Sequence, residues 1–323
     1  MRALVTGATG FVGSHLVEAL RRRGDTVTAL VRSPARATLL AELGVHMVPG
    51  DLAADSALAQ AVTDQDVVFH VAGAVAAASD DAYMRANRDG TANLVRAAEA
   101  AGAPRFVLVS SGAAGGPSSR GHPATADQPP RPVTAYGRSK LASEEVVRHS
   151  SLPWVILRPP TIYGPRDRDN LIKVFRMARL GVAPVFGDGS MELSAIFAPD
   201  LADALLAAGE GPALPGRTFY VNHPEVLTAG GLVREVARAM GRNVRLVGIP
   251  EWAGRGVLHV TGAAASLLGR TTILNADKAN EFFQDAWTAD PTPFMTAAGW
   301  TPGHAAAAGL AETYRWYRSA GWL

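Results

Sequence analysis

A tyrosine and a lysine four residues apart are the side chains of this sequence best suited to proton transfer. Tyr136 and Lys140 lie in the segment 135–149, whose pattern predicts a helix, so one turn brings both to the same face. An ammonium group beside a phenol favours the phenolate, and we expect it to lower the pKa of Tyr136 from about 10. Such a tyrosine can protonate a carbonyl oxygen, or deprotonate an alcohol, as a hydride moves. The lysine can also hold a ribose hydroxyl.

Two serines follow a predicted strand at 106–110. Ser110 and Ser111 close that strand, at the carboxyl edge where open α/β sheets bind their ligands. A hydroxyl there can donate a hydrogen bond to a developing oxyanion. The alternative is that these serines simply end a strand, so the pattern predicts a site only in combination with Tyr136 and Lys140.

A glycine-rich turn lies at 7–13, directly after a strand and directly before a helix. Backbone N–H groups in such a turn can approach a pyrophosphate, and the start of the helix favours its charge. The spacing is G-x-x-G-x-x-G, and the plainer alternative is that the glycines only permit the turn. The residues expected to face a dinucleotide here are Gly7, Thr9, Gly10, Phe11, Val12 and Gly13.

The end of the second predicted strand indicates which dinucleotide binds. NAD sites usually carry an acidic residue there for the ribose hydroxyls, and this strand runs into Arg32 with no acid. The guanidinium of Arg32 can bind a 2′-phosphate, and Arg36 can add a second charge, so we predict NADP(H), with NAD(H) as the alternative. Asp51, after the third strand, is a candidate for the adenine amino group or an ordinary turn residue.

Alternating strands and helices predict a doubly wound parallel sheet, the Rossmann arrangement. The predicted strands are 27–31, 45–48, 67–71, 106–110 and 155–157, and the helices between them include 12–23, 87–101 and 135–149. Residues 1–165 are expected to form this dinucleotide-binding domain. Residues 166–323 are expected to form a smaller, mostly helical substrate lobe, with short strands at 218–221 and 244–247, and the segment 195–210 can return to the large domain.

Composition narrows the class of protein. The chain has 323 residues and a net charge of +2, which is too small to indicate nucleic acid or a membrane surface as a partner. It contains no cysteine, which excludes disulfides and thiolate chemistry and fits a reducing cytoplasm. The histidines have no metal-binding spacing, and no long apolar run predicts a membrane span. We therefore expect a cytoplasmic protein without a metal, acting on a small molecule.

Seven motifs in this order resemble those of the extended short-chain dehydrogenases/reductases, the NAD-dependent epimerase/dehydratase superfamily. They are TGATGFVG (6–13), GDL (50–52), FHVAG (69–73), the helix start with Asn87 and Gly90-Thr91, VSS (109–111), YGRSK (136–140) and RPPTIYGP (158–165). GWTP (299–302) and Trp316-Tyr317 also fit, so the resemblance covers the whole chain. The stretch 31–34 resembles the NADP-preferring, dihydroflavonol-reductase-like and 3β-hydroxysteroid-dehydrogenase-like branch.

The resemblance implies a role for particular residues. Ser111, Tyr136 and Lys140 would form the catalytic triad, and the three glycines of 7–13 would hold the pyrophosphate. The remaining implied cofactor contacts are Asp51 and Leu52 at the adenine, Ala72, Gly73 and Ala74 on the ribose side, Ser110, and Pro159, Pro160 and Thr161 at the nicotinamide. A homodimer through the helices 87–101 and 135–149 would fit the family, although their outward faces are not obviously apolar.

Two departures from the nucleotide-sugar enzymes of this family point to a different substrate. The residues after Ser111 are small, beginning with Gly112 and Ala113, and the segment 192–200 has no basic residue to bind the phosphates of a sugar nucleotide. An apolar ketone, aldehyde or secondary alcohol fits better. Tyr163 and Arg166 are further candidates for substrate contact.

The expected activity is therefore hydride transfer between the nicotinamide of NADP(H) and a carbonyl or alcohol carbon of a largely apolar molecule, with Tyr136 as general acid/base. One alternative is a sugar-nucleotide epimerase or dehydratase that keeps its NAD(P) bound. The other is a regulatory or assembly factor that binds dinucleotide without catalysis, which an intact triad disfavours.

Overall fold

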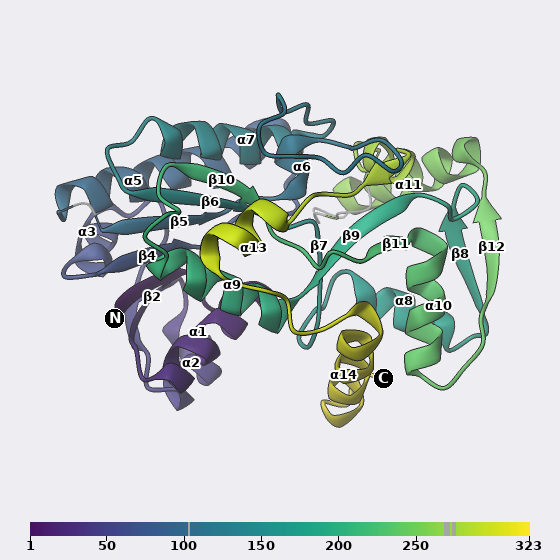
Figure 1. Ribbon diagram of the computed structural model, residues 1–323, viewed down its shortest axis with the longest axis horizontal. Helices are drawn as coiled ribbons and strands as arrows, with labels where there is room; N and C mark the ends of the chain where they lie inside the picture. Colours follow the sequence, from purple (N-terminus) through teal and green to yellow (C-terminus); the bar gives the residue numbers. More distant parts are fainter. Residues whose placement is uncertain (103, 268–271, 273–275) are drawn as a thin grey trace.

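Seven parallel strands form the large sheet of this protein, whose computed structural model describes residues 1–102, 104–267, 272 and 276–323 (Figure 1). The strand order is β10-β6-β5-β4-β1-β2-β3, so the chain reverses direction across the sheet between β1 and β4. Ligands of such sheets bind at the carboxyl ends of the strands beside this reversal. The strands are β1 (Arg2–Thr6), β2 (Thr26–Val31), β3 (His46–Pro49), β4 (Val67–His70), β5 (Arg105–Val109), β6 (Trp154–Arg158) and β10 (Arg217–Tyr220).

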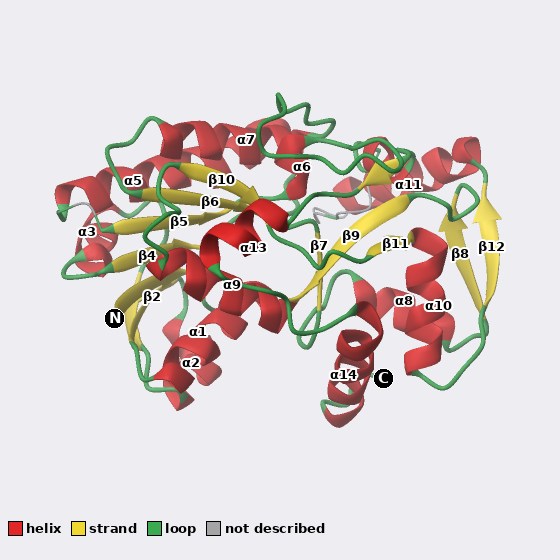
Figure 2. Cartoon of the chain, viewed as in Figure 1, coloured by secondary structure: helices red, strands yellow, loops and turns green. Residues whose placement is uncertain are grey.

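Helices cover both faces of this sheet, as Figure 2 shows, and the predicted fold class is confirmed. Neighbouring residues of a buried strand point to opposite faces, so Val5 packs with the helices of one face and Leu4 with those of the other. One face carries α1 (Phe11–Arg23), α9 (Ala198–Glu210) and α13 (Thr292–Ala298), and the other carries α3 (Asp55–Val62), α5 (Gly90–Ala100) and α7 (Ala135–Arg148).

Two later segments of the chain join the large sheet. The strand expected at 218–221 in the smaller lobe is β10, which pairs in parallel with β6 and extends the sheet at its edge. Helix α9, which follows β9 of the smaller lobe, packs against α1. The chain therefore passes between the large sheet and the smaller lobe more than once. Strand β10 returns to the large sheet because its backbone can hydrogen-bond along the edge of β6.

The rest of the chain forms a smaller lobe beside the carboxyl edge of the sheet (Figure 1). A two-stranded ribbon of β8 (Val182–Phe186) and β12 (Arg245–Ile249) packs on α8 (Leu171–Ala178) and α10 (Ala229–Ala239). A second small sheet joins β7 (Thr161–Tyr163), β9 (Glu192–Phe197), β11 (Val226–Thr228) and β13 (Ala286–Trp287). The remaining helices of the lobe are α11 (Glu251–Leu267), α12 (Ala279–Phe282) and α14 (Ala306–Ser319).

Short elements connect the main ones in the first half of the chain. They are η1 (Pro34–Arg36), α2 (Thr38–Glu42), α4 (Asp80–Met84), the π-helical turn η2 (Arg85–Asp89) and α6 (Gly112–Gly115). Among the helices of the described residues, none has both the length and the apolar character needed to cross a membrane.

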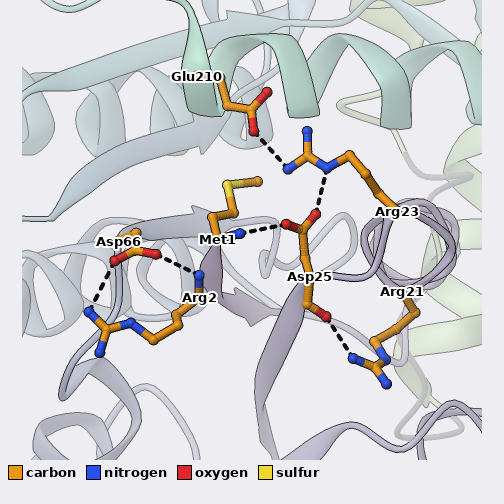
Figure 3. A network of polar contacts seen from close by, with 7 residues as sticks. All are labelled: Met1, Arg2, Arg21, Arg23, Asp25, Asp66 and Glu210. Atoms are coloured by element: carbon orange, nitrogen blue, oxygen red, sulfur yellow. Dashed lines mark hydrogen bonds and ion pairs between the residues drawn. The ribbon is translucent and has the colours of Figure 1, made fainter.

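A network of charges holds the amino ends of the first strands together (Figure 3). The Asp25 carboxylate accepts from the Met1 ammonium and from Arg23, each at 2.7 Å, and Arg23 also pairs with Glu210 of α9 at 2.8 Å. Although burial alone would raise it, the pKa of Asp25 lies below its ordinary value because of these two cations. The network therefore ties β1 and β2 to α9, at the end of the sheet opposite the carboxyl edge.

Candidate active site

One large cavity, with a volume of about 2060 Å³, follows the carboxyl edge of the sheet and continues into the smaller lobe. Its walls bring together residues that lie far apart in the sequence: the glycine turn, the ends of β2, β4 and β5, the start of α7, and parts of α8, β8 and α10. Every cofactor or catalytic residue predicted from the sequence lines this cavity.

The turn between β1 and α1 is built so that only glycine fits. Gly7 has a φ of +71°, and a Cβ placed on Gly13 would lie 2.1 Å from the Gly7 carbonyl oxygen. Helix α1 starts with Gly10 as its N-cap and has no side chain capping its first N–H groups. These N–H groups face the cavity, so the turn fits the pyrophosphate of a dinucleotide.

The cavity wall next to this turn carries the residues expected at the adenosine end. Arg32 and Arg36 are exposed and line the cavity, and within the described residues neither forms an ion pair. Asp51 accepts a hydrogen bond from the Ala53 N–H at 2.9 Å, which is the local turn contact that the alternative predicts. Leu52 lines the cavity and packs against Gly90, which also lines it. The arrangement leaves the guanidinium groups of both arginines available to an anion.

The ribose-side segment after β4 is fixed by one buried asparagine. The Asn87 side chain accepts from the Ala74 N–H at 2.7 Å and donates to the Ala74 carbonyl at 3.1 Å and to the Ser139 hydroxyl at 2.8 Å. A Cβ on Gly73 would lie 3.2 Å from this side chain and 3.6 Å from Lys140 Nζ. Asn87 therefore joins the segment after β4 to the helix that carries Tyr136, and it does so from a π-helical turn, a feature common near functional sites.

A buried histidine supports the same corner. The Thr6 hydroxyl contacts His70 Nδ1 at 2.7 Å, His70 Nε2 contacts Thr91 Oγ1 at 2.9 Å, and Thr91 donates to the Asn87 carbonyl at 2.6 Å. Since Thr91 already donates, its oxygen accepts from Nε2–H, and Nδ1 accepts from Thr6. Burial, with Lys140 nearby, lowers the pKa of His70 to about 3, so this ring is a neutral part of the framework.

Tyr136, Lys140 and Ser111 meet at the middle of the cavity. Lys140 Nζ donates to the Val109 carbonyl at 2.8 Å, which ties α7 to the end of β5. Ser111 caps α6 by accepting from the Ala113 N–H at 3.2 Å, and its side chain lies near enough to the Tyr136 phenol to act on its pKa. The helix spacing and the strand end thus place three groups where a substrate oxygen could contact Ser111 and Tyr136 together.

Burial dominates the electrostatics of this group. Desolvation raises the pKa of Tyr136 to about 12, against the lowering effect of the Ser111 hydrogen bond. Desolvation also lowers the pKa of Lys140 to about 8, while Glu144 acts to raise it. The expectation that Lys140 lowers the pKa of Tyr136 is therefore wrong, because the ammonium binds the Val109 carbonyl and the phenol has lost its water. Tyr136 is protonated at neutral pH.

A buried ion pair lies directly behind the triad. The Glu144 carboxylate, which is fully buried one turn after Lys140, accepts from Arg158 Nε at 2.9 Å and from a second Arg158 nitrogen at 2.7 Å. It also accepts from the Ser110 hydroxyl at 2.5 Å and from Arg148 at 2.6 Å. All four lone-pair directions of the carboxylate are used, so the network locks α7 onto β5 and β6.

The smaller lobe holds the start of α7, the helix that carries Tyr136 and Lys140. Asp277 accepts from the Ala135 N–H at 2.8 Å, and Glu281 of α12 accepts from the Thr134 hydroxyl at 2.9 Å. Thr134 in turn caps α7 by accepting from the Gly137 N–H at 3.2 Å. Both carboxylates line the cavity, so the lobe contributes charge close to Tyr136.

Comparison with known proteins places this site in a family. The model of the NAD dependent epimerase/dehydratase family matches residues 3–221. The chain belongs to this family. The family depends on a nicotinamide dinucleotide, and the β1–α1 turn described above fits that group.

The chain has relatives that match it along most of its length. It is 34% identical over 319 residues, 99% of this chain and 95% of the relative, to the ceramide reductase of Caulobacter vibrioides. It is also 34% identical over 260 residues, 75% of this chain and 76% of the relative, to the 2-alkyl-3-oxoalkanoate reductase of Stenotrophomonas maltophilia. The UDP-glucuronic acid 4-epimerase of Bacillus cereus, solved with NAD, has the same fold, with a TM-score of 0.80 at 21% identity over 99% of this chain and all of that one.

The predicted substrate contacts of this family member are only partly at the cavity. Gly112, Ala113 and Arg166 line it, beside Pro159, Pro160 and Thr161, but Arg166 is held by Glu18 and Ser14 of α1. The prediction that Tyr163 contacts the substrate is wrong. This side chain is 2% exposed, packs against Phe197 and does not line the cavity. The inward face of β7 carries Tyr163 into the core, and a motif match cannot show which face a strand residue takes.

Sequence reasoning did not single out four residues that the structure brings to the site as polar partners. They are His70, Glu144, Asp277 and Glu281. A signal existed for Glu144, which follows Lys140 by four residues and so shares its helix face. No local signal existed for the two lobe carboxylates, because their partners lie more than a hundred residues away.

Proposed function

We propose that this protein is an NADP(H)-dependent oxidoreductase that reduces the carbonyl group of a largely apolar small molecule. The observation that carries the proposal is the meeting of Ser111, Tyr136 and Lys140 at one point of a cavity that has a dinucleotide-type turn at one end and an apolar lobe at the other. The names of the two relatives, a ceramide reductase and a 2-alkyl-3-oxoalkanoate reductase, support carbonyl reduction.

The proposed roles follow from the protonation states. Tyr136 carries its proton at neutral pH and can donate it to a substrate carbonyl oxygen, since its pKa is about 12. Ser111 can hydrogen-bond the same oxygen as negative charge develops there. Lys140 fixes the end of β5 and can hold a ribose hydroxyl with its ammonium group. The bound dinucleotide would supply the hydride.

The direct test of this proposal is an assay with NADPH and three classes of compound: aliphatic ketones, aromatic ketones and UDP-glucose. We expect NADPH to be oxidised in proportion to the alcohol formed from a ketone, with no change of UDP-glucose. If every ketone is inert while UDP-glucose is converted to UDP-galactose without net loss of NADPH, the reductase proposal fails. That outcome would favour the epimerase alternative, against which the missing basic residues of 192–200 argue.

The proposed preference for NADP(H) rests on Arg32 and Arg36. Replacing Arg32 with alanine should lower the ratio of NADPH to NADH affinity by about tenfold to a hundredfold, because a charge-assisted bond to the 2′-phosphate contributes roughly 1.5–3 kcal/mol. The measurement is the dissociation constant of each dinucleotide. Arg22→Ala is the matched control, since Arg22 is exposed and lies outside the large cavity. An unchanged ratio in Arg32→Ala would remove the argument for NADP(H).

The low pKa of Lys140 predicts how NADPH binding responds to pH. With a pKa of about 8, the side chain loses its positive charge as pH rises past that value, and the ribose contact loses strength. We expect the affinity for NADPH to fall about tenfold between pH 7 and pH 9.5. In Lys140→Met the affinity should be low at both ends of this range and change little with pH. A wild-type affinity that is flat across the range would contradict the assignment.

A further inference from the structure

The part of the cavity inside the smaller lobe is lined by apolar side chains from six different elements. These residues, termed here the apolar wall, are Val174 and Met177 of α8, Pro184, Val185 and Phe186 of β8, Leu193 of β9, Leu232 and Val233 of α10, Ile249 of β12 and Val257 of α11. Among the described lining residues of these elements, Lys173 is the one that carries a charge, and it is exposed. The wall continues without a break in the cavity that contains Tyr136.

The polar groups that also line the lobe are mostly engaged with the protein itself. The Asp167 carboxylate accepts from the backbone N–H groups at the start of α8, including Leu171 at 2.8 Å, and Arg166 is paired with Glu18. The Arg168 guanidinium lies over the Trp322 ring, 5.0 Å from its centre. Within the described residues, a substrate group among the ten side chains of the apolar wall therefore meets one charged neighbour, the exposed Lys173 of α8.

This lining restricts the chemistry of what can enter. A second oxygen or a sugar at the far end of a substrate would lose its water beside the ten apolar side chains of the wall and gain no partner from them, which is costly. A hydrocarbon chain loses nothing and gains contact along its whole length. We propose that the apolar wall binds a long unbranched alkyl chain of the substrate ketone, while the carbonyl end lies at Tyr136. This proposal rests on the proposed reductase function and names its substrate class.

The wall also reaches the surface of the protein. Val257 lines the cavity and is 54% exposed, and Trp252, earlier on the same helix α11, is 80% exposed. The outer end of the wall is therefore open and apolar. A chain longer than the cavity can continue outward past α11, so additional length beyond the wall should add little affinity and cause no clash.

The test is a series of methyl ketones that differ only in chain length: 2-pentanone, 2-heptanone, 2-nonanone, 2-undecanone and 2-pentadecanone. We expect kcat/KM for NADPH-dependent reduction to rise about fourfold per added methylene, which corresponds to about 0.8 kcal/mol, and then to level off. The increase should come from KM, since the tail contributes equally before and during the reaction. The steroid ketone androstenedione, which carries a second oxygen far from the first, should be reduced poorly.

Two variants test whether the alkyl chain of the substrate binds at the apolar wall. Val174→Trp and Met177→Trp fill the cavity from α8, and each should abolish the gain in kcat/KM from added chain length. Arg176→Trp is the control, because Arg176 is exposed on the same helix and does not line the cavity. If both filling variants keep the full length dependence, or if wild-type kcat/KM is independent of length, the alkyl-chain proposal is wrong.

A binding titration separates this proposal from the proposed function. Trp287 lines the cavity, so quenching of tryptophan fluorescence by the same ketones without cofactor reports binding alone. If no ketone is reduced but affinity still rises with length, and Val174→Trp removes that rise, the reductase function fails and the alkyl site stands. If ketones are reduced and neither binding nor kcat/KM depends on length, or if androstenedione is the better substrate, the alkyl site fails and the reductase function stands.

Discussion

Replacing Tyr136 with phenylalanine is expected to lower kcat for ketone reduction by about 10²–10⁴-fold, while NADPH affinity changes by no more than a few-fold. The substitution removes one hydroxyl from the cavity and leaves the ring in place. The phenol is protonated at neutral pH and lines the same cavity as the glycine turn, Ser111 and the apolar wall. Steady-state kinetics with a saturating ketone, together with a dissociation constant for NADPH, measure both expectations.

Tyr83 provides the matched control for this variant. Its ring lies 6.1 Å from that of Tyr136, it also lines the cavity, and its hydroxyl donates to the Val75 carbonyl at 3.3 Å. Tyr83→Phe should therefore lower kcat by less than about tenfold, the cost of one ordinary hydrogen bond. Equal activity in wild type and Tyr136→Phe would show that another group supplies the proton.

The second large effect concerns stability. Glu144→Gln should lower the free energy of unfolding by about 3–5 kcal/mol, because it leaves the guanidinium of Arg158 charged and buried with a neutral partner. Arg158 is 2% exposed, and Glu144 is what keeps the pKa of this guanidinium high despite its burial. Urea unfolding of the two proteins, followed by circular dichroism, gives the difference directly.

The control uses the other arginine that binds the same carboxylate. Arg148 contacts Glu144 at 2.6 Å but is 31% exposed, so water can replace its partner. Arg148→Gln should cost at most about 1 kcal/mol, as exposed ion pairs do. If Glu144→Gln costs no more than Arg148→Gln, the buried pair does not hold α7 against β5 and β6 in the way described.

The large sheet could be predicted because its signals are local. Buried parallel strands are short aliphatic runs, and the observed β2, β4 and β5 lie within one or two residues of the predicted ranges. The glycine turn could also be predicted. A Cβ on Gly13 would collide with Gly7, so the turn requires glycine and leaves a pattern in the sequence. The helical spacing likewise placed Tyr136 and Lys140 together.

The parts that could not be predicted depend on distant partners or on burial. The sequence does not show that Glu144 is buried, because its partner Arg158 comes from a later strand and is brought beside it only by folding. The strand β10 was expected in the lobe, but pairing with β6 decides its sheet. The direction of the pKa shift of Tyr136 was wrong for the same reason, since spacing shows that Lys140 is near but shows neither the burial of the phenol nor the bond to Val109.

Transfer of deuterium tests the central claim most directly. NADPH labelled with deuterium at C4 of the nicotinamide, supplied separately in each of the two C4 configurations, is incubated with the protein and 2-undecanone, and the product is analysed by mass spectrometry. A carbonyl reductase must place one deuterium on the carbinol carbon from one of the two labelled forms, with one NADPH oxidised per alcohol formed. If 2-undecanol appears without deuterium from either form, or if no ketone of the series is reduced, the protein is not the reductase proposed here.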